Sequence, residues 1–247
     1  MNDDDLRFGG LARLYGAGGL ERLMRASVCV VGVGGVGSWA AEALARSGVG
    51  QITLVDLDDV CLSNVNRQLH ALDGVIGRPK VEVMAERIRA IHPSCRARAV
   101  AEFFTETTAE QILGTGFDFV VDAIDQVANK CLLISRCRKE QIPIVCAGGA
   151  GGRRDPAAIR VADLAQTSHD ALLQQVRKKL RDDYGFARDP KTPFGVPCVF
   201  STEPAVAPAD GCAGRVTCDN GYGTAGFVTG TFGLVAASRV VSRIAAG

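Results

Sequence analysis

The segment 27-SVCVVGVGGVGS-38 decides the fold of this chain. Five of its first six residues suit a buried strand, and glycines then follow at positions 32, 34, 35 and 37, ahead of the helix-favouring residues 40–45. Glycine allows a positive φ and takes the Cβ out of the path of an anion, while a helix N-terminus adds partial positive charge. The segment therefore predicts a strand, a tight turn and a helix that together bind a nucleotide phosphate.

The spacing Gly32-x-Gly34-x-x-Gly37 also matches the dinucleotide fingerprint. Asp56 ends the next predicted strand, residues 51–56, where a ribose-binding carboxylate would lie. These features do not separate NAD or FAD from ATP. That choice depends on the residues that follow Asp56.

After Asp56 the chain carries further polar residues that suit a nucleotide, namely Asp58, Asn64, Gln68, Arg67 and Lys80. Two cations beside a glycine turn suit a triphosphate better than the pyrophosphate of NAD, which the turn and the helix dipole largely satisfy alone. We therefore expect ATP. For either cation taken singly, the alternative is solvated surface charge.

Residues 117–122 form a continuous apolar run, which predicts a strand covered on both faces. Asp122 ends this run, and Asp125 follows it. Carboxylates beside phosphate oxygens suit magnesium. Asp125 is the better metal ligand of the two because it lies outside the apolar run. Its alternative role is the N-cap of a predicted helix, residues 127–141, and that role is compatible with metal binding.

Strands and helices alternate along the chain, which predicts one α/β domain built on a doubly wound, mostly parallel sheet. The glycine turn, Asp56, Asp122 to Asp125 and Gly148 to Gly149 all fall at the ends of predicted strands, so they should converge on one edge. We divide the 247 residues into a helical arm (1–26) that Gly9, Gly10 and the glycines after Tyr15 interrupt, a nucleotide-binding half (27–152) and a substrate and dimer half (153–247).

The composition is that of a globular protein, with 47% hydrophobic and 22% charged residues. A net charge of +1 gives no global signal for nucleic acid, so a local patch would have to hold a polyanionic partner. Nine cysteines without any Cys-x-x-Cys pair fit neither a disulfide framework nor a four-thiolate zinc site. We expect a cytoplasmic protein.

Two stretches bear on membranes. The N-terminus, MNDDD, is acidic and lacks the apolar core of a secretory signal. The uncharged run 220–238 contains five glycines, which favours a buried helix with close backbone packing over a membrane span. We therefore expect no membrane association.

In combination, these motifs resemble the adenylating superfamily of HesA, MoeB, ThiF and the ubiquitin-activating enzymes. Three further stretches, 7-RFGGLARLYG-16, 148-GGAGG-152 and 198-CVFSTE-203, are similar to the tRNA threonylcarbamoyladenosine dehydratase family within it. The similarity covers essentially the whole chain. It implies that Gly34 and Gly35 lie against the ATP phosphates and that Asp56 binds the ribose hydroxyls. It also implies roles for charged residues around the triphosphate: Asn64, Arg67 and Lys80 as triphosphate ligands, Asp125 as the magnesium ligand, and Arg13 reaching the ATP of the other subunit of a homodimer.

The resemblance implies an enzyme that uses ATP to dehydrate, and thereby cyclise, threonylcarbamoyladenosine beside the tRNA anticodon, releasing AMP and pyrophosphate. Adenylation of the C-terminus of a sulfur-carrier protein, as in ThiF and MoeB, is the alternative. Those relatives usually carry two Cys-x-x-Cys zinc pairs, which this chain lacks. Binding of a sulfur-relay protein, and of a monovalent cation (Na⁺ or K⁺) near residues 148–152, is left open.

Basic residues of the second half are the candidates for tRNA contact: Arg153, Arg154, Arg177, Lys178, Lys179 and Arg181. Phosphate contacts would make such binding depend on salt, and a solvated helix face is the alternative. Cys198 and Cys218 are candidates for an acceptor thiol, although a buried and inert cysteine is the commoner case.

Overall fold

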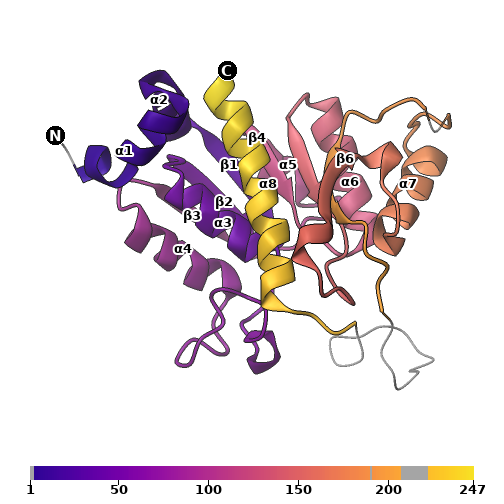
Figure 1. Ribbon diagram of the computed structural model, residues 1–247, viewed down its shortest axis with the longest axis horizontal. Helices are drawn as coiled ribbons and strands as arrows, with labels where there is room; N and C mark the ends of the chain where they lie inside the picture. The colour runs from indigo at the N-terminus through magenta and orange to yellow at the C-terminus, as the bar shows by residue number, and fades with distance from the viewer. Residues whose placement is uncertain (1–2, 190, 207–221) are drawn as a thin grey trace.

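The computed structural model describes residues 3–189, 191–206 and 222–247. Seven strands form one sheet in the order β3-β2-β1-β4-β5-β7-β6, and every neighbouring pair is parallel except β6 with β7. Their bounds are β1 Ser27–Val31, β2 Gln51–Val55, β3 Arg96–Val100, β4 Phe119–Asp122, β5 Ile144–Ala147, β6 Ile159–Asp163 and β7 Pro197–Ser201. The predicted doubly wound, mostly parallel α/β fold is confirmed (Figure 1).

Helices connect the strands and flank the sheet. They are α1 Asp3–Tyr15, α2 Ala17–Arg25, α3 Gly37–Arg46, α4 Lys80–Ile91, α5 Ala109–Leu113, α6 Val127–Lys139, α7 Ala171–Asp183 and α8 Gly226–Ala246, with short 3₁₀ turns η1 Leu62–Asn64, η2 Pro156–Ala158 and η3 Leu164–Gln166. One continuous sheet runs through both predicted halves of the chain, and the functional division at residue 152 stays a prediction.

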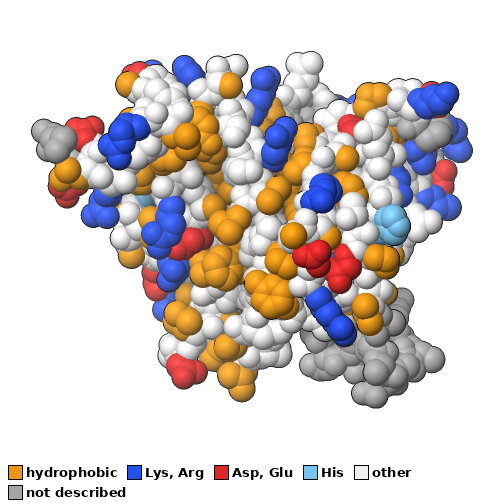
Figure 2. All heavy atoms as spheres, viewed as in Figure 1, with side chains coloured by type: hydrophobic (Ala, Val, Ile, Leu, Met, Phe, Trp, Pro, Cys, Tyr) orange, Lys and Arg blue, Asp and Glu red, His pale blue; other side chains and the backbone are white. Residues whose placement is uncertain are grey.

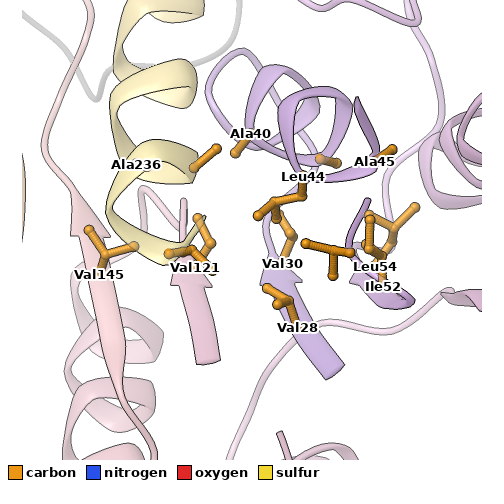
Figure 3. Close-up of a cluster of buried hydrophobic side chains, with 14 of the residues drawn as sticks. Val28, Val30, Ala40, Leu44, Ala45, Ile52, Leu54, Val121, Val145 and Ala236 are labelled. Carbon is orange, nitrogen blue, oxygen red and sulfur yellow. The ribbon is translucent and has the colours of Figure 1, made fainter. Parts of the chain in front are cut away.

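The alternating side chains of β1 divide the core into two layers. Val28 and Val30 pack with α3, α4 and α8 on one face, whereas Cys29 and Val31 pack with α5, α6 and α7 on the other. Figure 3 shows Val30 of β1 beside Leu44 of α3, with Val28 further along the strand. Each fully buried valine or leucine contributes about 1.5–3 kcal/mol. Because both faces are covered, the strand reads as a continuous apolar run in the sequence.

Glycines of α8 let this helix pack closely against α3. A Cβ on Gly233 would lie 2.4 Å from the carbonyl oxygen of Val36, and one on Gly230 would lie 3.4 Å from the Trp39 ring. The prediction of a buried helix with close backbone packing is therefore confirmed for its described part. No helix in the described parts of the chain is long and apolar enough to cross a membrane.

The N-terminal arm joins the amino end of β1, opposite the glycine turn. The predicted helix break at Gly9 and Gly10 is wrong, because α1 runs through both residues and ends before Gly16, whose φ is +78°. Glycine lowers helix stability by only about 1 kcal/mol, and the buried Phe8 ring, 4.6 Å from the ring of His92, holds α1 in place.

Candidate active site

A cavity of about 800 Å³ opens at the carboxyl ends of β1, β2, β3 and β4. Its walls come from the ends of these four strands, the loops that follow them and the first turn of α6: Val31, Gly32, Gly34, Val55, Asp56, Asp58, Glu102, Phe103, Phe104, Thr105, Ala123, Ile124, Asp125, Gln126 and Asn129. Ligands of doubly wound sheets bind in such a crevice. The predicted convergence of the glycine turn with Asp56 and Asp125 is thus observed.

The glycines of the turn divide into two kinds. Gly32 has a φ of +89°, and a Cβ on Gly37 would lie 1.8 Å from the carbonyl oxygen of Gly32, so the turn itself requires both residues. Gly34 lines the cavity, and a Cβ there would meet only the amide nitrogen of Gln68 at 3.9 Å. A Cβ on Gly35 would lie 3.3 Å from the methyl group of Thr229. Gly34 is therefore the position where backbone and ligand would approach most closely.

Gly34→Ala should fold normally but bind ATP at least about tenfold more weakly, since the added methyl group stands between the backbone and the phosphates. Calorimetric titration with ATP and a thermal unfolding curve measure the two effects. Gly37→Ala is the contrast, because its methyl group would collide with the backbone of the turn and lower the thermal midpoint. Unchanged ATP affinity in Gly34→Ala would show that the phosphates do not approach this residue.

Asp56 connects the turn to the end of β2. Its carboxylate accepts hydrogen bonds from the N–H of Val33 at 2.7 Å and from the N–H of Asp58 at 2.9 Å. Burial raises the pKa of Asp56, while these two N–H groups and the ammonium of Lys80 oppose the shift. The side chain stands at the cavity wall, where the sequence predicts ribose binding, and it also fixes the position of the glycine turn.

Lys80 is the first residue of α4, and its ammonium pairs with Asp58, which lines the cavity. Its Nζ lies 2.7 Å from Oδ2 of Asp58, and its own N–H donates to the Asp58 carbonyl at 3.0 Å. Lys80 is 6% exposed, and Asp58 lines the cavity. The ammonium is therefore held at the edge of the site, within a buried setting that strengthens its attraction to an anion.

The loop before α4 places Arg67 beside the turn. A Cβ on Gly35 would lie 3.4 Å from Cγ of Arg67, while the guanidinium donates to the carbonyl of Ser63 at 2.6 Å and to Oδ1 of Asn66 at 3.0 Å. The Arg67 carbonyl in turn accepts a hydrogen bond from the Trp39 indole at 3.1 Å. The structure thus brings Arg67 to the turn, and its contact with ATP stays a prediction.

Asn64 and Gln68 lie in the same loop and are both buried. Oδ1 of Asn64 accepts from the N–H of Cys61 at 3.0 Å, so this side chain shapes the loop. The amide of Gln68 approaches Gly34, and within the described ranges its Oε1 has no hydrogen-bond partner. Gln68 therefore has an acceptor to offer at the turn.

Asp125 is exposed and lines the cavity. Gln126 occupies the N-cap of α6 and no side chain caps that helix, so the alternative N-cap role for Asp125 is wrong. Its carboxylate makes no hydrogen bond or ion pair with the described part of the chain. Asp125 is thus available to a ligand or a metal ion.

Asp122 does not line the cavity, so the prediction that it belongs to the nucleotide site is wrong. Its carboxylate is 0% exposed, lies 2.9 Å from Nζ of Lys130 and accepts from the N–H of Ile124 at 3.0 Å. Burial works against both charges, and the Asp122 carboxylate nevertheless raises the pKa of Lys130. We therefore treat the two residues as a buried ion pair beneath the site. A lysine in an otherwise apolar stretch, 130–134, was the sequence signal for it.

His70 lies in the loop between β2 and α4, and it makes the free energy of unfolding depend on pH. It is 1% exposed, and among the residues described neither ring nitrogen has a hydrogen-bond partner. Burial, together with the nearby charges of Lys80 and Arg87, lowers its pKa to about 4. The unfolded chain then binds a proton that the folded chain does not between pH 6.5 and about 4.

The free energy of unfolding should therefore fall as the pH drops through this window, by up to about 3 kcal/mol from His70. Urea unfolding at several pH values measures this slope. His70→Gln should show a shallower slope, though not zero, because burial also lowers the pKa of His92 against the opposing effect of Asp4. Identical slopes in the two proteins would contradict this role.

One predicted tRNA contact in the second half of the chain is buried. Arg153, a predicted tRNA contact, is 3% exposed, donates to the carbonyls of Gly149 and His169 at 2.5 and 2.8 Å, and lies 3.5 Å from Asp170. Asp170 also caps α7 by accepting from the N–H of Leu173. The prediction of a tRNA contact is wrong for Arg153, because a buried carboxylate neutralises its charge inside the fold.

The other predicted tRNA contacts remain at or near the surface. Arg154 is exposed, while Lys178 and Lys179 lie within 3.0 and 2.6 Å of Asp182 and Asp183. Arg177 and Arg181 are partly buried against Thr167 and Ala187. Cys198 is fully buried in β7 and does not line the cavity, whereas Cys218 lies outside the described residues.

Arg13 does not line the cavity of its own chain. It lies in α1, is exposed, and folds back to within 3.7 Å of where a Cβ on Gly9 would stand. The arm joins the amino end of β1, whereas the cavity opens at the carboxyl end of that strand, so Arg13 is remote from the site of its own chain. Its contact with the ATP of another copy stays a prediction.

Comparison with known proteins agrees with this site. A model of the ThiF family matches residues 10–246. The chain is 50% identical to tRNA threonylcarbamoyladenosine dehydratase of Escherichia coli (strain K12), over 97% of this chain and 94% of that protein, and 47% identical to the Haemophilus influenzae protein of the same name, over 99% and 95%. The crystal structure of E. coli tRNA N6-threonylcarbamoyladenosine dehydratase, TcdA, in complex with ATP matches with a TM-score of 0.91 and 49% identity, covering 99% of this chain and 96% of that one. The resemblance in the sequence is thereby confirmed: this chain belongs to the ThiF family and, within it, to the tRNA threonylcarbamoyladenosine dehydratases.

Proposed function

We propose that this chain uses ATP to dehydrate N6-threonylcarbamoyladenosine in tRNA. The observation that carries the proposal is the single cavity wall formed by the glycine turn, Asp56 and the unpaired Asp125, in a chain that shares its fold and half its residues with a dehydratase solved in complex with ATP. The turn would hold the phosphates and Asp56 the ribose. That orientation leaves the α-phosphorus open toward the carboxylate to be activated.

The reaction then follows from the chemistry of an acyl adenylate. The threonyl carboxylate of the modified nucleoside attacks the α-phosphorus of ATP and displaces pyrophosphate. A nucleophile within the same modification attacks the activated carbonyl, closes a ring and expels AMP, so the net change is the loss of one water. The ring closure is intramolecular and gains from proximity, so no enzyme nucleophile is required. The cations Arg67 and Lys80, with Arg13 of a second copy, would stabilise the charge that develops at phosphorus.

Magnesium fits the charges of the cavity. Four carboxylates, those of Asp56, Asp58, Glu102 and Asp125, stand on its wall and would repel a triphosphate. Asp125 would hold Mg²⁺ together with phosphate oxygens, and the ion would offset this repulsion and polarise the phosphate. For a monovalent cation near residues 148–152 the support is weaker, because the cation Arg153 already donates to the Gly149 carbonyl.

A homodimer would bring Arg13 to the site of the second copy. Phe227 and Leu234 of α8 are 61% and 49% exposed and lie seven residues apart, on the same face of the helix. Figure 2 shows hydrophobic side chains grouped along and beside α8. Such an apolar face is typical of a surface that another protein covers. We place the dimer contact on this face.

Sulfur-carrier adenylation remains the second candidate, since the same cavity could activate the C-terminus of a carrier protein. The absence of Cys-x-x-Cys pairs disfavours it, and so does the burial of Cys198, which removes one candidate acceptor thiol. A sulfur-relay partner therefore has no observation in its favour.

For tRNA we retain Arg154, Lys178 and Lys179 as phosphate contacts. Seven described cysteines without a disulfide are in keeping with a reducing cytoplasm.

The test is mass spectrometry of nucleosides from threonylcarbamoylated tRNA incubated with this protein, ATP and magnesium. We expect a product lighter than the substrate nucleoside by one water, formed only with ATP and with one AMP released per product. Incubation with a carrier protein that ends in Gly-Gly is the parallel reaction. AMP transfer to the carrier without any change in the tRNA would favour the second candidate.

A further inference from the structure

Glu102 stands on the cavity wall just beyond the end of β3. The N–H of Asp56 donates to the carbonyl of Val100 at 3.2 Å, so the end of β3 is tied to the residue that would bind the ribose. Glu102 follows Val100 by two residues. The two carboxylates therefore belong to one wall, with Glu102 on the side away from the glycine turn.

One oxygen of the Glu102 side chain lacks a partner. Oε2 is buried and makes no hydrogen bond in the part of the chain that the structure describes. Its neighbours Phe103 and Phe104 also line the cavity and offer only apolar side chains. An unpaired carboxylate oxygen beside apolar groups is unfavourable. Because Glu102 already lines the cavity, a rotation of its side chain would present this oxygen to a donor supplied by a ligand and relieve that cost.

The segment that carries Glu102 is held in place by its own hydrogen bonds. Oγ1 of Thr108 donates to the carbonyl of Phe103 at 2.7 Å and accepts from the N–H of Thr105 at 2.9 Å. These bonds fix the backbone on the C-terminal side of Glu102. The wall is thus organised before a ligand arrives, which favours selective recognition over adaptation to several ligands.

The arrangement offers a place for the base of a nucleotide. With the phosphates at the glycine turn and the ribose at Asp56, the base would extend toward the wall of residues 102–105, where Phe103 and Phe104 offer an apolar surface. The only charged side chain among those four residues is a hydrogen-bond acceptor. We infer that Glu102 accepts a hydrogen bond from the 6-amino group of adenine and thereby selects ATP against nucleotides that carry oxygen at that position. This inference rests on the proposed use of ATP at this site.

Purine riboside triphosphate, which lacks the 6-amino group, provides the first test. The wild-type chain should bind ATP about 10- to 100-fold more tightly than this analogue, because a hydrogen bond to a charged group is lost. In Glu102→Ala the preference should fall to within about threefold, with the affinity for the analogue nearly unchanged. Equal binding of the two nucleotides by the wild-type chain would overturn the inference, as would an equal loss for both in Glu102→Ala.

Inosine triphosphate distinguishes recognition of the base by Glu102 from a purely structural role of this residue. Its 6-oxygen would face the Glu102 carboxylate, so the wild-type chain should reject it. Glu102→Gln keeps the shape of the side chain and can donate from its amide, so the ratio of inosine triphosphate to ATP affinity should rise at least about tenfold. Glu110→Gln, an exposed change on α5, is the matched control and should leave the ratio unchanged. An unaltered ratio in Glu102→Gln would overturn the inference, whereas a wild-type chain that binds neither ATP nor its analogues would overturn the proposed function itself.

Discussion

Asp125→Ala should leave folding intact and slow tRNA-dependent pyrophosphate release about 100- to 1000-fold, the usual cost of removing one group that stabilises charge in a transition state. Folding should not change because the side chain is exposed and does not cap α6. The rate should change because this carboxylate would hold the magnesium ion on the phosphates. A coupled assay of pyrophosphate release at several magnesium concentrations measures the effect.

Asp73→Ala is the matched control, since Asp73 is also exposed and lies in the loop before α4 but does not line the cavity. It should retain the wild-type rate. If Asp125 binds the metal, high magnesium should recover part of the lost rate in Asp125→Ala. Wild-type turnover in Asp125→Ala would remove the residue from the proposed mechanism.

Lys130→Met should lower the free energy of unfolding by about 3–5 kcal/mol, because it leaves the fully buried carboxylate of Asp122 without its partner. For a chain of this length the thermal midpoint should fall by about 6–20 °C. The variant keeps most of the volume of the side chain, so the loss would report the unpaired charge rather than a cavity. Calorimetry or urea unfolding gives the value.

Two comparisons separate the charge effect from a general effect of losing a lysine. Lys178→Met removes an exposed partner of Asp182 and should cost at most about 1 kcal/mol. Adding Asp122→Asn to Lys130→Met keeps an acceptor for the N–H of Ile124 and removes the buried charge, so it should restore part of the stability. A double variant no more stable than Lys130→Met would contradict the explanation.

Much of the site could be predicted because it lies where strands end. The glycine turn, Asp56 and Asp125 each follow a short apolar run, and parallel strands bring their carboxyl ends to one edge. Glu102 follows a strand in the same way, but its own strand, β3, is at the edge of the sheet and is only partly buried, so its end is less distinct in the sequence. The predicted helix break at Gly9 and Gly10 was wrong because a local propensity was outweighed by the packing of Phe8.

The sequence by itself determined the alternation of strands and helices, the position of the phosphate turn and the acid after β2. Each of these depends on neighbouring residues, through side-chain periodicity or the conformational freedom of glycine. Only the tertiary structure decided that Asp122 pairs with Lys130, that Arg153 is buried against Asp170, and that Asp125 stays free. The direction in which a charged side chain points is set by which distant group can neutralise it once water is excluded, and that partner is fixed by packing rather than by adjacency in the chain.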